Sequence, residues 1–354
     1  DMDFATAPFV TDAIRKRCEN EVLGYTGKPD SYYNAIINWV KQRYDLIVTK
    51  EVINFVPGIV PGIGMAMNCF TQKGDKVMIQ PPVYHPFAWV TTRNERTLVI
   101  NPLKWENGMY RMDLDAFREQ IKGCKLFILC NPHNPGGVVW TEAELRAIAD
   151  ICYDEKVLVF SDEIHADLTL PPHTHRPFAT VSEKARMNSV TFMSPSKAFN
   201  MPGLSASHAL IFNEDLRKRF RIYMDAGELD MGHVFAFLSV EAAYSHGTEW
   251  LDQCLAYIQG NIDFVDEFLK KHAPKIKAIR PEASYLVWLD CRELELSQKD
   301  LNEFFVDKAH LALNDGEMFG KEGIGFMRLN VASPRCIIEK AMKQLADAYQ
   351  LYIK

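Results

Sequence analysis

The sequence lacks long hydrophobic runs and an excess of positive charge. Its longest uninterrupted apolar run is five residues, as in Leu126 to Cys130, whereas a helix needs about 20 such residues to span a bilayer. Lys and Arg number 40 against 46 Asp and Glu, so the formal net charge is −6. A negative field repels nucleic acid and anionic membranes. We therefore expect neither a membrane protein nor a nucleic-acid-binding protein.

Paired cysteine motifs are also absent. The eight cysteines are scattered, without a C-x-x-C pair or a Cys/His spacing typical of zinc. His173 and His175 would make half of a metal site at most, and the prolines before them indicate a solvated loop. We predict reduced thiols, a cytoplasmic location and no metal. Asp1 to Phe4 show neither a signal peptide nor an initiator Met, so we expect an N-terminal arm to precede them.

What the sequence does contain is an alternation of strand-like and helix-like segments. A chain of 354 residues is long enough for two domains. The helix predicted over Thr141 to Asp154 starts with a capping box formed by Thr141 and Glu144. The predicted strands are Val52–Phe55, Lys76–Ile79, Leu98–Ile100, Lys125–Cys130, Val157–Phe160, Val190–Met193 and Ala209–Phe212. This alternation predicts an α/β fold with a mainly parallel sheet.

A second pattern follows Thr248. One periodic helix runs to about Lys271, long enough to bridge two domains. Beyond it, weaker strands and two helices predict a smaller α+β domain. These strands are Ile276–Ile279, Tyr285–Leu289 and Gly325–Leu329, and the helices are Gln298–Lys308 and Pro334–Ile353.

Common nucleotide-binding and serine-nucleophile motifs do not account for the chain. Gly62 and Gly64 begin a G-x-G-x-x-G pattern, but Met67 takes the place of its third glycine. Ser194 and Lys197 match S-x-x-K, but neither K-T-G nor S-D-N follows. Dinucleotide binding and serine acyl transfer are therefore disfavoured.

Four polar motifs each follow a predicted strand, where open α/β sheets bind ligands. Pyridoxal 5'-phosphate (PLP) chemistry requires an amine, a carboxylate at the ring nitrogen and a polar partner for the ring oxygen, and the motifs contain all three. In chain order they are Asn131-Pro-His-Asn-Pro-Gly-Gly137, Ser161-Asp-Glu-Ile-His165, Ser194-Pro-Ser-Lys-Ala-Phe199 and Arg328-Leu-Asn-Val-Ala332.

With these motifs in this order, the chain resembles the PLP-dependent fold type I family (aspartate-aminotransferase-like, aminotransferase class I/II) over essentially its whole length. Together with Asp1-Met2-Asp3-Phe4, the motifs are most similar to the MalY/PatB-type cystathionine β-lyase branch. The resemblance implies a large PLP-binding domain over residues 26–258. It also implies a small domain built from both chain ends, residues 1–25 and 259–354.

The resemblance implies roles for the motif residues. Lys197 carries the Schiff base and then removes the substrate Cα proton. Asp162 pairs with the pyridine nitrogen, and Asn134 donates to the ring 3-oxygen. His165 stands where many aminotransferases have a Tyr that also contacts the 3-oxygen, so it is expected to bind the cofactor. The residues alone leave ordinary alternatives open, such as a helix N-cap for Asp162 and a turn for Asn134.

Further positions match the family's phosphate and substrate contacts. Tyr84 is expected to stack on the pyridine, and Arg328 to bind the substrate carboxylate. Tyr25 is expected to reach the phosphate of a neighbouring subunit, which implies a homodimer with shared active sites. Ser205 replaces the usual phosphate-binding Arg, a departure typical of the lyase branch. The expected phosphate donors are the backbone of Gly58, Ile59 and Val60 and the hydroxyls of Ser194 and Ser196.

These observations predict a carbon-sulfur β-lyase that converts cystathionine or a related cysteine S-conjugate to a thiol, pyruvate and ammonia. The alternative is a PLP-dependent aminotransferase, because the first half of both reactions is identical. Three ordinary alternatives remain. Tyr84 could be a packed core residue, Arg328 could form a surface ion pair, and Tyr25 could be an aromatic residue in a simple turn. A regulatory protein partner also stays open.

Overall fold

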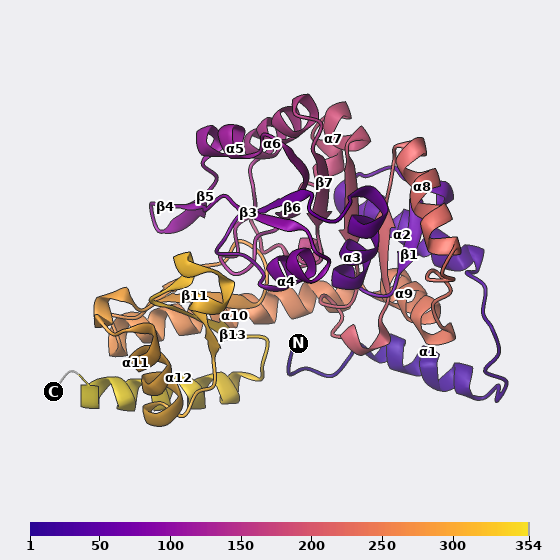
Figure 1. Cartoon of the computed structure of the whole chain (residues 1–354). Coiled ribbons are helices and arrows are strands. Elements are labelled where there is room, and N and C mark those ends of the chain that lie inside the picture. Colours follow the sequence, from indigo (N-terminus) through magenta and orange to yellow (C-terminus); the bar gives the residue numbers. More distant parts are fainter. Residues whose placement is uncertain (353–354) are drawn as a thin grey trace.

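Seven strands form the central sheet, in the order β1-β9-β8-β7-β6-β2-β3 (Figure 1). The computed structural model describes residues 1–352. Every strand of this sheet runs in the same direction except β9, so the carboxyl ends of six strands meet at one edge. The strands are β1 (Ile53–Val56), β2 (Lys76–Ile79), β3 (Thr97–Ile100), β6 (Cys124–Cys130), β7 (Leu158–Asp162), β8 (Ser189–Met193) and β9 (Ser207–Leu210).

Helices cover both faces of this sheet because its strands are apolar on both sides. In β6, Leu126 and Ile128 pack on one face, whereas Phe127 and Leu129 pack on the other. The first face is covered by α3 (Ile59–Phe70), α4 (Pro86–Arg93) and α8 (Glu214–Asp225). The second is covered by α5 (Leu114–Gln120), α6 (Glu142–Asp154) and α7 (Glu183–Met187).

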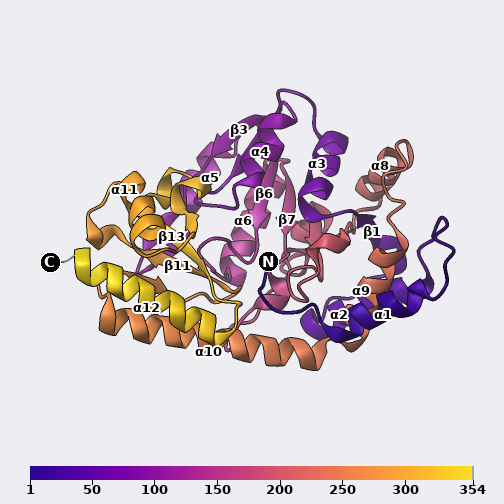
Figure 2. The same cartoon turned by 90° about the horizontal axis from the view of Figure 1, so that it is seen from below.

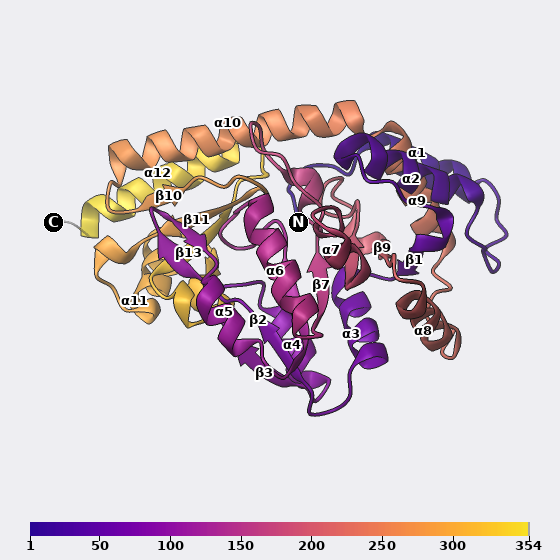
Figure 3. The same ribbon diagram turned by 90° about the horizontal axis from the view of Figure 1, so that it is seen from above.

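A smaller antiparallel sheet lies beside the central one, in the order β10-β11-β13-β12. The 25-residue helix α10 (Thr248–His272) runs along both parts of the molecule (Figures 2 and 3). The elements of this part are β10 (Lys277–Ile279), β11 (Leu286–Asp290), β12 (Asn314–Asp315), β13 (Phe326–Asn330), α11 (Gln298–Glu303) and α12 (Arg335–Tyr352). A short hairpin of β4 (Lys104–Glu106) and β5 (Met109–Arg111) completes the strands.

The first residues of the chain connect the two parts. Asn200 in the large part donates to the Phe4 carbonyl at 2.7 Å and accepts from the Met2 amide at 3.1 Å. On the other side, the Asp3 amide donates to the Ala332 carbonyl at 2.8 Å. The N-terminus therefore lies between the two parts (Figure 2). The chain then continues into α1 (Pro8–Cys18) and α2 (Asp30–Tyr44), which pack with α9 (Val234–His246).

The predicted α/β class with a mainly parallel sheet and a smaller α+β part is confirmed. The capping box at Thr141 is present, and the long helix after Thr248 ends at His272. The strand predicted over residues 209–212 lies instead at Ser207–Leu210. Of the last predicted helix, Ile353 lies outside the described residues, and the domain boundaries stay a prediction. Among residues 1–352, no helix is both long and apolar enough to cross a bilayer.

Candidate active site

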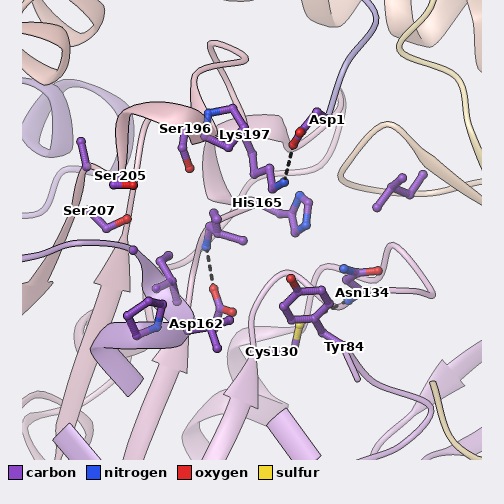
Figure 4. A pocket seen from close by; sticks show the side chains of 18 of the residues that line it. Asp1, Tyr84, Cys130, Asn134, Asp162, His165, Ser196, Lys197, Ser205 and Ser207 are labelled. Atoms are coloured by element: carbon purple, nitrogen blue, oxygen red, sulfur yellow. Dashed lines mark hydrogen bonds and ion pairs between the residues drawn. The ribbon is translucent and has the colours of Figure 1, made fainter. Parts of the chain in front are cut away.

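A cavity of about 390 Å³ opens at the carboxyl edge of the central sheet, facing β11 and β13 (Figure 4). The strand order explains why: β1, β6, β7 and β8 all end at this edge, and the loops that follow them carry the polar motifs. Ten of the predicted site residues line the cavity. They are Gly58, Ile59, Val60, Tyr84, Asn134, Asp162, His165, Ser196, Lys197 and Arg328.

The N-terminus of α3 forms one end of the cavity. Gly58 precedes the helix at φ 148°, a conformation that favours glycine, and Ile59 begins the first turn. First-turn amides have no intrahelical acceptor, so they attract anions. Pro61 has no N–H and sits in the same turn at no cost in hydrogen bonds. The hydroxyl-bearing residues Ser196, Ser205 and Ser207 line the same cavity, which makes this end suitable for a phosphate.

Lys197 supplies the amine of the site. Its Nζ lies 3.0 Å from Oδ1 of Asp1 (Figure 4). Burial and the nearby charge of Arg328 lower the pKa of the Lys197 ammonium below its ordinary value. A lowered pKa raises the fraction of free amine, which is the nucleophilic and basic form. Sequence patterns did not point to the Asp1 contact, because the two residues are 196 positions apart.

Asp162 ends β7 with its side chain in the cavity. The carboxylate is 4% exposed and accepts one hydrogen bond, from the Ile164 amide at 3.1 Å. No side-chain donor contacts it within residues 1–352. Burial raises the pKa of Asp162 to about 7. A buried carboxylate without a cationic partner is suited to binding a protonated ring nitrogen.

Asp162 should make the stability of the cofactor-free chain depend on pH. Its folded pKa of about 7 lies above the ordinary 3.8, so the folded state binds more protons between these values and its free energy of unfolding falls as pH rises. We expect Asp162→Asn to gain about 4 kcal/mol relative to the parent between pH 4 and 7.5. Urea unfolding at both pH values measures this difference. If the free energy of unfolding changed with pH equally in variant and parent, the prediction would be contradicted. Asp12→Asn is the control, because Asp12 is exposed.

Arg328 lies on β13 and faces the cavity from the opposite side. Its Nη1 donates to Asn134 Oδ1 at 2.9 Å, and its Nη2 donates to Asn314 Oδ1 at 2.8 Å. Both acceptors are neutral, and Nε is buried without a partner in the described part of the chain. Burial lowers the pKa of the guanidinium to about 10, so it remains charged at neutral pH. The site therefore holds an uncompensated cation that suits a substrate carboxylate.

Tyr84 and His165 add rings to the cavity wall. Burial raises the pKa of the half-buried Tyr84 hydroxyl and lowers the pKa of His165 to about 3. His165 is therefore neutral near pH 7, and one of its ring nitrogens, Nδ1, is buried without a partner in residues 1–352. Both residues offer aromatic surface to a ligand in the cavity.

The predicted solvated loop is confirmed for residues 171–174, which are exposed, but it is wrong for His175. His175 and Glu163 are both buried, and His175 Nε2 lies 2.8 Å from Glu163 Oε2. Glu163 also accepts from the Ser161 hydroxyl and the Phe178 amide, each at 2.8 Å. Local composition missed this pair because its partners are 12 residues apart and meet only after folding. The pair supports the end of β7 from the side away from the cavity.

Two predicted site residues do not line the cavity. Ser194 is buried and donates to the Ala206 carbonyl at 2.7 Å, while it also lies 2.9 Å from the Ser196 hydroxyl. Tyr25 is 97% exposed, away from the cavity. The cavity instead includes residues that were not predicted as site residues, namely Asp1, His85, Cys130, Ser207 and Tyr285. His85 directly follows the predicted Tyr84 in the sequence, and this adjacency could have been used to predict it as a site residue.

Comparison with known proteins gives concordant matches. The family model for aminotransferase class I and II matches residues 1–345. Cystathionine beta-lyase PatB of Bacillus subtilis is 37% identical, covering 98% of this chain and 90% of the relative. Cystalysin from Treponema denticola, whose crystal structure contains pyridoxal 5'-phosphate, superposes with a TM-score of 0.97 at 34% identity, covering 100% and 90% of the two chains. The PLP-bound C-S lyase from Staphylococcus hominis superposes with a TM-score of 0.92 at 34% sequence identity, covering 99% of this chain and 90% of that chain.

Proposed function

Because the chain belongs to the aminotransferase class I and II family, we propose that it is a PLP-dependent carbon-sulfur β-lyase. It cleaves cystathionine or related cysteine S-conjugates to a thiol, pyruvate and ammonia. The observation that carries this proposal is one cavity that combines an amine, a buried carboxylate, a helix N-terminus and a guanidinium whose hydrogen-bond acceptors are neutral. Full-length similarity to a cystathionine β-lyase at 37% identity supports the reaction class.

The side chains present fit pyridoxal phosphate. The first turn of α3 and the neighbouring serines suit its phosphate, Asp162 suits its ring nitrogen, and Lys197 suits its aldehyde. When bound, this cofactor supplies an aldehyde that binds amines covalently and a ring that accepts the electron pair left on Cα. Asn134 and His165 would hold the ring oxygen, and Tyr84 would cover one ring face.

The chain's own residues then divide the work of elimination. Arg328 binds the α-carboxylate of the substrate and so orients Cα toward Lys197. Lys197 Nζ takes the Cα proton, for which its lowered pKa is suited. The Cβ–S bond breaks and the sulfur departs with its electron pair as thiolate. Water completes the conversion of the three-carbon remainder to pyruvate and ammonia.

Two further parts of the proposal concern assembly and location. A homodimer is supported by Tyr25, whose exposed ring is free to serve the phosphate site of a second subunit. The apolar side chains of Val22 and Leu23 are also exposed beside it, as expected for a segment covered by another copy. A cytoplasmic location is supported by the eight cysteines, all unpaired within residues 1–352.

Product analysis tests the reaction. We expect cystathionine or S-methyl-cysteine to give pyruvate and thiol in equal amounts. Amino-group transfer to keto acids should be at least about tenfold slower, or about 1.4 kcal/mol higher in barrier. Transfer from aromatic or aliphatic amino acids to 2-oxoglutarate without thioether cleavage would replace the proposal with the aminotransferase alternative. Coupled pyruvate and thiol assays measure one reaction, and amino-acid analysis measures the other.

A further inference from the structure

A second cavity of about 490 Å³ lies next to the candidate active site. It is formed between β2, α4 and the short helical turns Gly316–Phe319 and Lys321–Gly323. Its lining is mostly apolar, and Trp89, Ile100 and Met318 are 47%, 42% and 38% exposed. Apolar side chains of this size are seldom exposed together in a hollow unless a ligand or partner covers them.

The two cavities share a wall. His85 lines both of them, and its ring packs against Trp89 with centroids 4.5 Å apart. On the other side of the wall, the Arg328 guanidinium lies 4.6 Å from the centroid of the Phe319 ring. Phe319 itself lines the second cavity. The Phe319 ring therefore separates the second cavity from the guanidinium that is assigned to the substrate carboxylate.

This spacing matches the shape of a cysteine S-conjugate. With the carboxylate on Arg328 and Cα near Lys197, the substituent on sulfur is only a few bonds from the carboxylate. It would extend past His85 toward Trp89. Val83, Trp89 and Phe319 offer no hydrogen bonds from their side chains, whereas the charged residues Glu317, Lys321 and Glu322 also line the cavity. An aryl or alkyl substituent would gain by burial against the first three side chains.

We infer that the groove formed by Trp89, Ile100, Met318, Phe319, Val83 and His85, here termed the Trp89 groove, binds the leaving-group side of apolar cysteine S-conjugates. This inference rests on the proposed function and narrows its substrate class. The preferred substrates carry an aryl or branched alkyl group on sulfur.

Kinetics with substrates that differ only in the sulfur substituent test the inference. We expect kcat/KM for S-benzyl-cysteine to exceed that for S-methyl-cysteine, whose substituent is too small to fill the groove, at least tenfold. We also expect Trp89→Ala to lower the ratio of kcat/KM for S-benzyl-cysteine over S-methyl-cysteine about tenfold. Tyr153→Ala is the matched control, because Tyr153 is a similarly exposed aromatic residue on α6 (48%) outside the groove. An unchanged ratio in Trp89→Ala overturns the inference.

Binding gives a readout that does not depend on turnover. In the Lys197→Ala background, calorimetric titration with S-benzyl-cysteine should give a Kd about tenfold higher when Trp89→Ala is added. Equal affinity in the two proteins overturns the inference. Failure of the proposed function gives a different result from either of these. If the parent enzyme is not a carbon-sulfur lyase, it yields no pyruvate from S-methyl-cysteine or cystathionine.

Discussion

Lys197→Ala should lower pyruvate formation from cysteine thioethers by about 10³-fold or more. Its Nζ is the amine placed among Asp1, Asp162 and Arg328 in the cavity, and a positioned general base contributes about 10²- to 10⁴-fold. Loss of the covalent attachment to the cofactor adds to this effect. Initial rates over a range of substrate concentrations, with the cofactor in excess, measure the loss in kcat.

The control for this experiment is Lys184→Ala, because Lys184 pairs with Asp150 and Asp154 on the surface, away from the cavity. Borohydride reduction of the parent enzyme, followed by peptide mapping, should label Lys197 with the cofactor. Labelling of another lysine, or a Lys197→Ala variant with near-normal turnover, would show that the amine of the site has been assigned incorrectly.

Arg328→Ala should raise KM for amino-acid substrates about 10²-fold. Hydrogen bonds to a charged partner are worth about 1.5–3 kcal/mol each, and a hundredfold change corresponds to about 2.7 kcal/mol. Within residues 1–352, the hydrogen-bond partners of Arg328 are the neutral Asn134 and Asn314, so its charge is available to a carboxylate. Arg328→Lys should recover part of the affinity, because it keeps the charge but loses the planar fork.

A second arginine outside the cavity provides the comparison. Arg292 pairs with Asp290 through Nη2 at 2.7 Å and does not line the cavity, so Arg292→Ala should leave KM within about twofold. The effect of Arg328→Ala is then compared for an α-amino acid and for the matching amine that lacks the carboxylate. An effect on the amino acid alone identifies Arg328 as the carboxylate contact. If Arg328→Ala lost the same factor for both compounds, Arg328 would not be the carboxylate-binding residue.

The sequence predicted the framework because strands and helices have local signals. The apolar runs that became β6, β7 and β8 were located within three residues, and the capping box at Thr141 fixed the start of α6. Nine of the ten predicted residues in the cavity lie in motifs at or just after the ends of central strands, and the strand order places them together. The tenth, Arg328, lies on β13 of the smaller sheet. The helix predicted over Gln298–Lys308 has the observed bounds, but its second part, Phe304–Lys308, is a π-helix, and no local signal indicated that geometry.

What the sequence did not predict depends on contacts between distant residues. His175 is polar and follows two prolines, which favours exposure, yet Glu163 stabilises it inside the protein. Asp1 meets Lys197 only because Asn200, Asn330 and Ala332 hold the first residues in place. The Trp89 groove likewise requires β2 and the turn at Phe319 to come together, which no local pattern encodes.

The alternation at the end of β7 limits how this chain can change in length. Ser161 and Glu163 share one side, as the hydrogen bond between them shows, while Asp162 occupies the other. Inserting or deleting one residue in the strand would exchange these sides. Glu163 would then enter the cavity, and Asp162 would take the place beside His175. Point substitutions elsewhere in β7 leave this alternation intact, so insertions and deletions are the more damaging class of mutation here.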